Sequence, residues 1–164
     1  ELLQFGIFPQ IRFGDVEMQL WQLDPEELLR ELLSDCDSDS RPHQAAMELV
    51  EKLLLYRHKE VLLPLLQFSQ LHLEAADQSD LAHANKEGAL VLLGLMADHL
   101  VDLDPTQLPE GGEGKKQKKK GRNRPSQTVS IEELLARFVL PALASSAAFV
   151  RLRALWVSAA FARQ

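Results

Sequence analysis

EGALVL, at residues 87–92, is the central one of three short stretches that share a pattern. The other two are QAAMEL at 44–49 and LRALWV at 152–157. Each places a small residue, Ala46, Ala89 or Ala154, early in a long apolar helical pattern. A small residue at such a position lets a neighbouring helix approach closely. The three stretches therefore indicate helices that stack on one another.

The spacing of the three stretches predicts the architecture. The first interval between the alanines is 43 residues and the second is 65, an excess of 22 that is close to the length of a low-complexity segment at 104–129. Without that segment the period stays near 43, within the range of about 40–47 residues for HEAT and armadillo helix pairs. We predict an all-α fold, a HEAT-repeat α-solenoid. The paired helices repeat less regularly, so a six-helix globular bundle remains the alternative.

Six helical segments follow from the apolar spacing. The first opens at Asp24 and Pro25, where Asp24 can cap the helix and Glu27 completes a capping box. The others are predicted over 42–56, 59–75, 80–101, from 130 onward and from about 147 to the end. We therefore assign HEAT-type helix pairs to 1–103 and 130–164, separated by a disordered basic loop at 104–129 whose glycines and prolines break the helical pattern.

Composition limits the class of protein. Hydrophobic residues make up 46% of the 164 residues and charged residues 26%, as in soluble globular proteins. No signal peptide or membrane span is predicted, and Cys36, the only cysteine, cannot form an internal disulfide. The chain starts without Met and ends inside an apolar pattern, so we expect a fragment of a longer chain.

Charge is unevenly distributed along the chain. Outside the run KKQKKKGRNR at 115–124, 11 Lys and Arg stand against 24 Asp and Glu. An acidic body favours basic partner proteins and disfavours general nucleic-acid binding. The basic run itself is a candidate partner-binding segment through Lys115, Lys116, Lys118, Lys119 and Lys120. A localisation signal, a nucleic-acid patch, a segment that folds back on the acidic body and a solvated insertion remain open for it.

Motifs that carry catalysis or bind metals and cofactors are missing from the sequence. Asp35, Asp37 and Asp39 resemble the start of a calcium loop, but the required Gly and Glu are replaced by Ser40 and Ala46. The five histidines form no HExxH pattern, and no Gly-x-Ser-x-Gly elbow occurs. We predict no enzyme activity, no cofactor and no metal.

Three stretches together resemble a known family. They are Phe8-Pro9 with Leu20-Trp21 and Asp24-Pro25, then Lys86-Glu87-Gly88-Ala89, then Val139-Leu140-Pro141 with Arg151-Leu152-Arg153-Ala154-Leu155-Trp156. Their order and spacing are similar to central HEAT repeats of the importin-beta (karyopherin-beta) superfamily, in the branch of importins seven and eight. The loop at 104–129 departs from that pattern, so no function is carried over to it.

The resemblance implies a nuclear transport receptor. Such a receptor binds cargo on its helical-repeat surface, and the GTP-bound form of the small GTPase Ran controls cargo release, mainly through parts outside this segment. Its expected partners are basic cargo proteins, Ran and nuclear pore proteins, with no specific nucleic acid. Its expected location is nucleus and cytoplasm, and the nuclear envelope in transit. A HEAT-repeat scaffold or regulatory subunit unrelated to transport is the alternative.

Two arginines beside Trp156 are the other candidate partner-binding residues. Arg151 and Arg153 could contact acidic groups of a partner, or they could bond to carbonyls and carboxylates of the adjoining repeat. Trp21 is predicted to fill the joint between two repeats rather than to bind a ligand.

Overall fold

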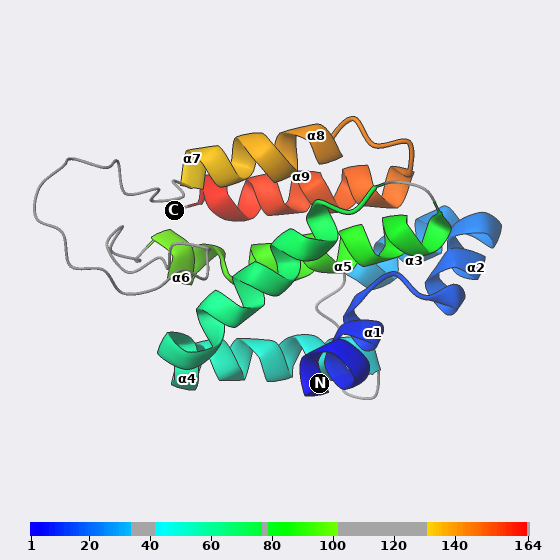
Figure 1. Cartoon of the computed structure of the whole chain (residues 1–164). Helices are drawn as coiled ribbons and strands as arrows, with labels where there is room; N and C mark the ends of the chain where they lie inside the picture. The colour runs from blue at the N-terminus through cyan, green and yellow to red at the C-terminus, as the bar shows by residue number, and fades with distance from the viewer. Residues whose placement is uncertain (34–41, 77–78, 102–130, 164) are drawn as a thin grey trace, which may run out of the picture.

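The computed structural model describes residues 1–33, 42–76, 79–101 and 131–163 (Figure 1). Every regular element in these ranges is a helix, which confirms the all-α prediction. The elements in chain order are η1 (Leu2–Ile7), α1 (Phe8–Ile11), α2 (Asp15–Leu23), α3 (Pro25–Leu33), α4 (Pro42–Leu73), α5 (Asp80–Leu95), α6 (Ala97–Val101), α7 (Ile131–Leu134), η3 (Leu135–Val139), α8 (Leu140–Ala142) and α9 (Ala148–Ala162).

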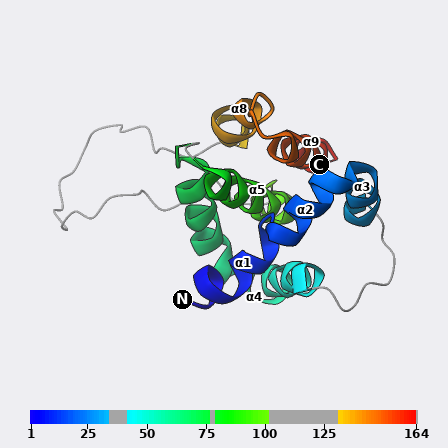
Figure 2. The ribbon, with the colours of Figure 1, turned by 90° about the vertical axis from the view of Figure 1, so that its right-hand side faces the viewer.

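The helices form two layers. The first half of α4 lies in a row with α5 and α9, and the second half of α4 and the α7–α8 rod form the other layer (Figures 1 and 2). The three aligned helices are those that carry Ala46, Ala89 and Ala154, and all three alanines are buried. This is the stacking that the repeated stretches predicted. A continued superhelical path, which defines a solenoid, stays a prediction.

One predicted boundary occurs as a change of direction, and one predicted helix is divided in two. Arg57 has φ −135° and ψ 28°, outside the helical region, and it divides α4 between the two predicted segments 42–56 and 59–75. The segment predicted over 80–101 is interrupted at Met96, after which α6 continues. At the start of α3, the backbone N–H of Glu27 donates to Oδ1 of Asp24 at 3.0 Å, as predicted for the cap.

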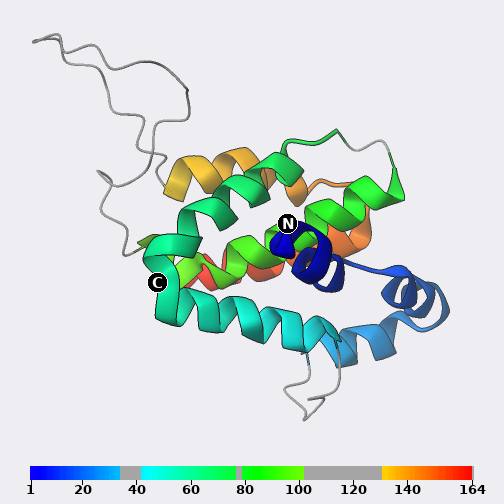
Figure 3. The same ribbon diagram turned by 60° about the horizontal axis from the view of Figure 1, so that its bottom comes forward.

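The structure also contains amino-terminal helices that the sequence pattern did not predict. The elements η1, α1 and α2 precede Asp24, where no helix was expected. Figure 3 shows η1 and α1 in the angle between the two halves of α4. Short segments of this kind are not stable alone and form because they pack on other helices. The spacing of apolar residues within each segment therefore does not predict η1, α1 and α2.

The core confirms most of the predicted apolar stripes. Within the segment predicted over 80–101, the apolar residues at helical spacing are all buried, namely Ala89, Leu92, Leu93, Met96 and Leu100. The stripe of the second half of α4 is buried in the same way, namely Leu62, Leu65, Leu66 and Leu73. Leu49 differs from the prediction, because 44% of it is exposed. Val50 and Leu54, which belong to the same predicted stripe, are buried as expected.

Candidate functional site

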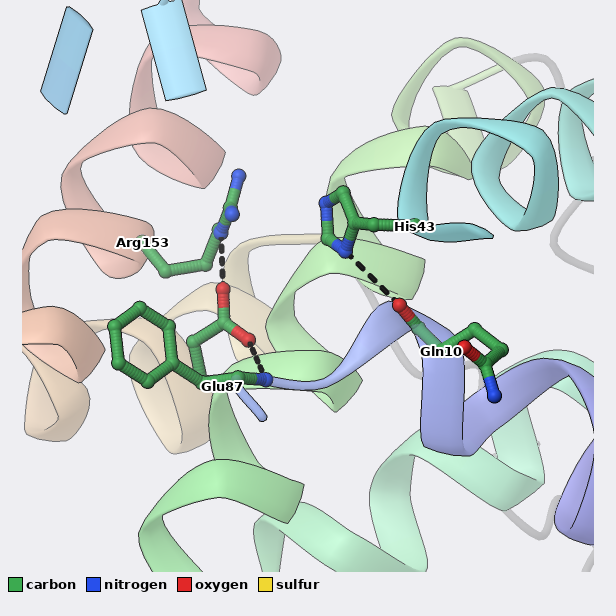
Figure 4. Close-up of polar contacts among 5 residues, drawn as sticks. Gln10, His43, Glu87 and Arg153 are labelled. Carbon is green, nitrogen blue, oxygen red and sulfur yellow. Dashed lines mark hydrogen bonds and ion pairs between the residues drawn. The ribbon is translucent and has the colours of Figure 1, made fainter. Parts of the chain in front are cut away.

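Glu87, which is 2% exposed, lies at the centre of the molecule in the middle of an otherwise apolar helix face. Its Oε1 accepts a hydrogen bond from Nε of Arg153 at 2.7 Å, and its Oε2 accepts one from the backbone N–H of Phe13 at 3.0 Å (Figure 4). Both oxygens of the buried carboxylate are thus satisfied, as burial of a charge requires. The Glu87 side chain thus joins α5 to α9 and to the amino-terminal segment that contains Arg12 and Phe13.

Gly88 brings that amino-terminal segment against α5. A Cβ added at Gly88 would lie 2.8 Å from Cβ and 2.9 Å from Cα of Arg12. Arg12 also donates from Nη1 to Oδ1 of Asn85 at 2.9 Å. The Lys-Glu-Gly-Ala stretch therefore supplies both the carboxylate that binds the segment and the close approach that the bond needs.

A second contact holds the same segment to α4. Nδ1 of His43 lies 3.0 Å from the backbone oxygen of Gln10 (Figure 4). Because a carbonyl oxygen only accepts hydrogen bonds, this ring nitrogen is the donor. The end of α1 is thereby attached to the first turn of α4.

The structure places both candidate arginines on α9 in intramolecular contacts. Besides its ion pair with Glu87, Arg153 stacks its guanidinium carbon 5.2 Å from the ring centre of Trp156. Arg151 donates from Nη1 to the backbone oxygens of Ser145 at 2.8 Å and Ser146 at 3.0 Å. The Arg153 contact with a carboxylate of another helix matches the structural role considered for it, whereas Arg151 bonds to carbonyls directly before its own helix and not to an adjoining repeat. Binding of a partner by either arginine stays a prediction.

The other residues considered in the sequence do not belong to the Glu87 network. Lys115, Lys116, Lys118, Lys119 and Lys120 lie outside the described residues, as does the Asp35–Asp39 stretch. Trp21 is half-buried and packs against the hydrophobic core, and its predicted place in the joint between two repeats stays a prediction.

An aromatic cluster lies where α1 meets the second half of α4. The His72 ring stacks on Phe8 with centroids 4.6 Å apart and meets Phe68 edge-on at 4.7 Å. Burial in this cluster lowers the pKa of His72, and the nearby charge of Arg12 lowers that pKa further. Both causes disfavour the charged imidazolium, so His72 is held neutral.

Surface pockets among the described residues include one at the α2–α3 hairpin and one at the end of α9. The larger, about 790 Å³, lies beneath the α2–α3 hairpin and is lined by residues that include Arg12, Leu20, Leu28 and His43. The smaller, about 470 Å³, lies between α4, the α5–α6 junction and α9. Its lining combines carboxylates with an indole ring, a combination that spacing along the sequence did not indicate.

The described ranges hold neither a metal-binding cluster nor a membrane-spanning helix. No group of three or more His, Cys, Asp or Glu side chains there is arranged to hold a metal ion. Among the helices described, none combines the length and apolar character needed to cross a membrane.

Comparison with known proteins shows a similarity to an importin beta-like protein. The chain is 25% identical over 159 residues to an importin beta-like SAD2 homolog of Arabidopsis thaliana. The match covers 95% of this chain, which spans 13% of the length of that relative. No protein-family model and no solved structure matches the chain. The similarity indicates a distant relationship with importin beta-like proteins.

Sequence reasoning missed Glu87 as the central polar residue of the fold. Arg153 lies 66 residues from Glu87 along the chain, and Phe13 lies 74 residues from it. The available signal was a carboxylate directly before the small residues Gly88 and Ala89, at the start of the uninterrupted apolar part of the helix. Such a carboxylate has to be paired if the helix is buried on all sides.

Proposed function

We propose that this chain is a segment of a nuclear transport receptor of the importin-beta type. The observation that carries the proposal is the similarity to an importin beta-like protein over 95% of the chain. The two-layered stack of helices supports it, because a repeat architecture presents extended surfaces for protein partners. In this proposal the helix pairs are consecutive HEAT-type units of a solenoid, and the chain has no catalytic role.

The partners in this proposal are basic cargo proteins. Outside the run 115–124 the chain carries more than twice as many acidic as basic residues. A surface of one sign attracts partners of the opposite sign and speeds their association. Release of cargo by the GTP-bound form of Ran, contact with nuclear pore proteins and shuttling between nucleus and cytoplasm belong to the same proposal.

A pull-down with the natural protein tests the transport function. The protein is immobilised and loaded with nuclear extract, and then washed with Ran locked in its GTP form or, as the control, with Ran bound to GDP. The proposal predicts that basic proteins are retained and that only the GTP form removes them. Retention of the same proteins under both washes would favour a HEAT-repeat scaffold instead.

A further inference from the structure

One face of α2 carries apolar side chains that line the larger pocket. Val16, Leu20 and Leu23 recur at i, i+4 and i+7, the spacing of a single helix face, and all three belong to the lining. Val16 is 75% exposed and Leu23 is 85% exposed. The opposite face of α2, with Met18 and Trp21, packs against the hydrophobic core. The helix therefore has one apolar face turned inward and a second one open to solvent.

Three further elements complete the walls of the larger pocket. Pro9 of α1, Leu28 of α3 and Pro42 of α4 line it together with α2. The α2–α3 hairpin stands at one end of the molecule, and the pocket of about 790 Å³ lies there (Figure 1). Apolar side chains left open around a cavity of this size are typical of a binding site for a partner.

Three polar side chains that line the larger pocket are already bonded within the chain. Nη1 of Arg12 donates to Oδ1 of Asn85 at 2.9 Å. Nδ1 of His43 lies 3.0 Å from the backbone oxygen of Gln10. Oε2 of Glu17 accepts a hydrogen bond from the backbone N–H group at the start of α2. Recognition by the larger pocket therefore depends on its apolar walls and not on these polar groups.

The hairpin that forms the larger pocket is acidic. Residues 15–30 contain five Asp and Glu side chains and one cation, Arg30. Arg30 pairs with Glu27, and the Asp24 carboxylate caps α3. A hydrogen bond from a backbone N–H group leaves the charge of a carboxylate in place, so the excess of negative charge does not require an unpaired carboxylate. Such a surface attracts a basic partner toward the apolar pocket.

An α-helix suits the larger pocket better than an extended segment does. The lining elements α1, α2, α3 and α4 are helices, whose backbone groups bond within each helix, so an extended peptide finds no strand edge to pair with. An incoming helix bonds its own backbone groups and places a ridge of apolar side chains between those of the lining. Lysine and arginine on the flanks of that helix then face the acidic hairpin.

We infer that the larger pocket, walled by Val16, Leu20 and Leu23, is the docking site for an amphipathic helix of a basic partner protein. The inference rests on the proposed function, because it takes a basic protein as the partner, and it adds the place and the form in which that protein is recognised. Aliphatic side chains of the partner helix supply most of the affinity. Its cations supply the attraction to the hairpin and exclude acidic helices.

The test compares two double variants that remove equal numbers of exposed apolar side chains. Val16→Gln with Leu23→Gln makes the wall of the larger pocket polar. Leu71→Gln with Leu155→Gln changes residues of α4 and α9 outside it, which are 67% and 58% exposed. All four side chains are exposed and glutamine is a good helix former, so both variants should fold, which circular dichroism checks.

The probe is a fluorescein-labelled peptide of leucine, alanine and lysine whose leucines recur at i, i+3, i+4 and i+7. Two further peptides serve as controls. One has the same composition in an order that leaves no apolar helix face, and the other has every lysine replaced by glutamate.

Binding of the lysine peptide to the 164-residue chain is measured by fluorescence anisotropy. The pocket variant should weaken binding by at least about tenfold, because burial of aliphatic side chains carries the affinity. The control variant should change the Kd by less than about twofold, since residues outside the binding site contribute little. The backbone amide signals of residues 15–23 should shift when unlabelled peptide is titrated into isotope-labelled protein.

Each other outcome overturns a stated part of the inference. Equal weakening in both double variants, or amide shifts that leave out residues 15–23, would overturn the pocket. Equal affinity for the two lysine peptides would overturn the recognition of a helix. Binding of the glutamate peptide as tight as that of the lysine peptide would overturn the choice of a basic partner. Failure of all three peptides to bind would overturn the docking site, whereas failure of Ran-GTP to release cargo from the natural protein would overturn the transport function alone.

Discussion

The indole ring of Trp156 on α9 lies directly on the backbone of α5 at Gly94. A Cβ added at Gly94 would be 2.0 Å from Cζ3 and 2.7 Å from Cη2 of Trp156. No side chain larger than a hydrogen atom fits there without a shift of the ring. The position of Trp156, and with it the wall of the smaller pocket, therefore depends on the absence of a side chain at residue 94.

Gly94→Ala should destabilise the fold by about 1–3 kcal/mol through overpacking. The added methyl group has to displace a large ring that α9 holds in place, so strain outweighs the gain in helix propensity. Urea denaturation measures the loss, and the Trp156 fluorescence should change in the folded state.

Gly6→Ala is the matched control for this substitution. The added Cβ would lie 3.2 Å from Cδ1 of Leu2, whose side chain is 71% exposed and free to turn away. Its effect should be neutral or stabilising by up to about 1 kcal/mol, since alanine is the better helix former. Equal destabilisation in both variants would show that Trp156 is not the obstacle.

Gly88→Ala should loosen the amino-terminal segment from α5. Its Cβ would meet Cα of Arg12 at 2.9 Å, and backbone cannot turn away as a side-chain tip can. The segment has to move, which lengthens the bond from Phe13 to Glu87. Hydrogen exchange of the Phe13 amide should become faster by at least about tenfold, equivalent to about 1.4 kcal/mol of lost protection. Unchanged exchange at Phe13 would contradict this account.

Regular helix packing was predictable from the sequence, whereas the polar centre was not. The stripes of α5 and of the second half of α4 follow from spacing within one helix, and the Asp24 cap follows from neighbouring residues. Glu87 and Arg153 belong together only because α5 and α9 stack, and no spacing rule connects residues so far apart. The helices before Asp24 were missed for the same reason, because α1 packs on α4 and α5, and α2 packs on α3.

The ion pair of Glu87 with Arg153 should be strongly coupled in a double-mutant cycle. Arg153→Met leaves a carboxylate buried with one hydrogen bond, which should cost about 3 kcal/mol. Glu87→Met leaves Arg153 and the Phe13 amide without an acceptor. The double variant should lose less than the sum of the single losses, with a coupling energy of about 1–3 kcal/mol. Urea denaturation of the four proteins measures the cycle.

Arg137→Met provides the control for this cycle. Arg137 makes an ion pair of the same 2.7 Å length with Glu74, but their side chains are 65% and 51% exposed. Water competes for such a pair, so its removal should cost less than about 1 kcal/mol. If Arg153→Met lowered the free energy of unfolding by no more than Arg137→Met, burial would not explain the contribution of the Glu87 pair to stability.

His72 should make the fold less stable as the pH falls. Burial first and Arg12 second lower its pKa in the folded state below the ordinary value of 6.5. The unfolded chain therefore binds a proton at a higher pH than the folded chain does. Stability attributable to His72 is fully present above the ordinary value and declines as the pH falls through it toward the lowered pKa.

Denaturation at several pH values between about 7.5 and 5.5 measures this loss, in a window above the range where most carboxylates titrate. His72→Gln removes the titrating group, so the dependence of stability on pH should be smaller than in the natural chain. Arg12→Met removes only the second cause, and it should reduce the dependence without abolishing it. A His72→Gln variant with the full pH dependence of the natural chain would show that the loss arises elsewhere.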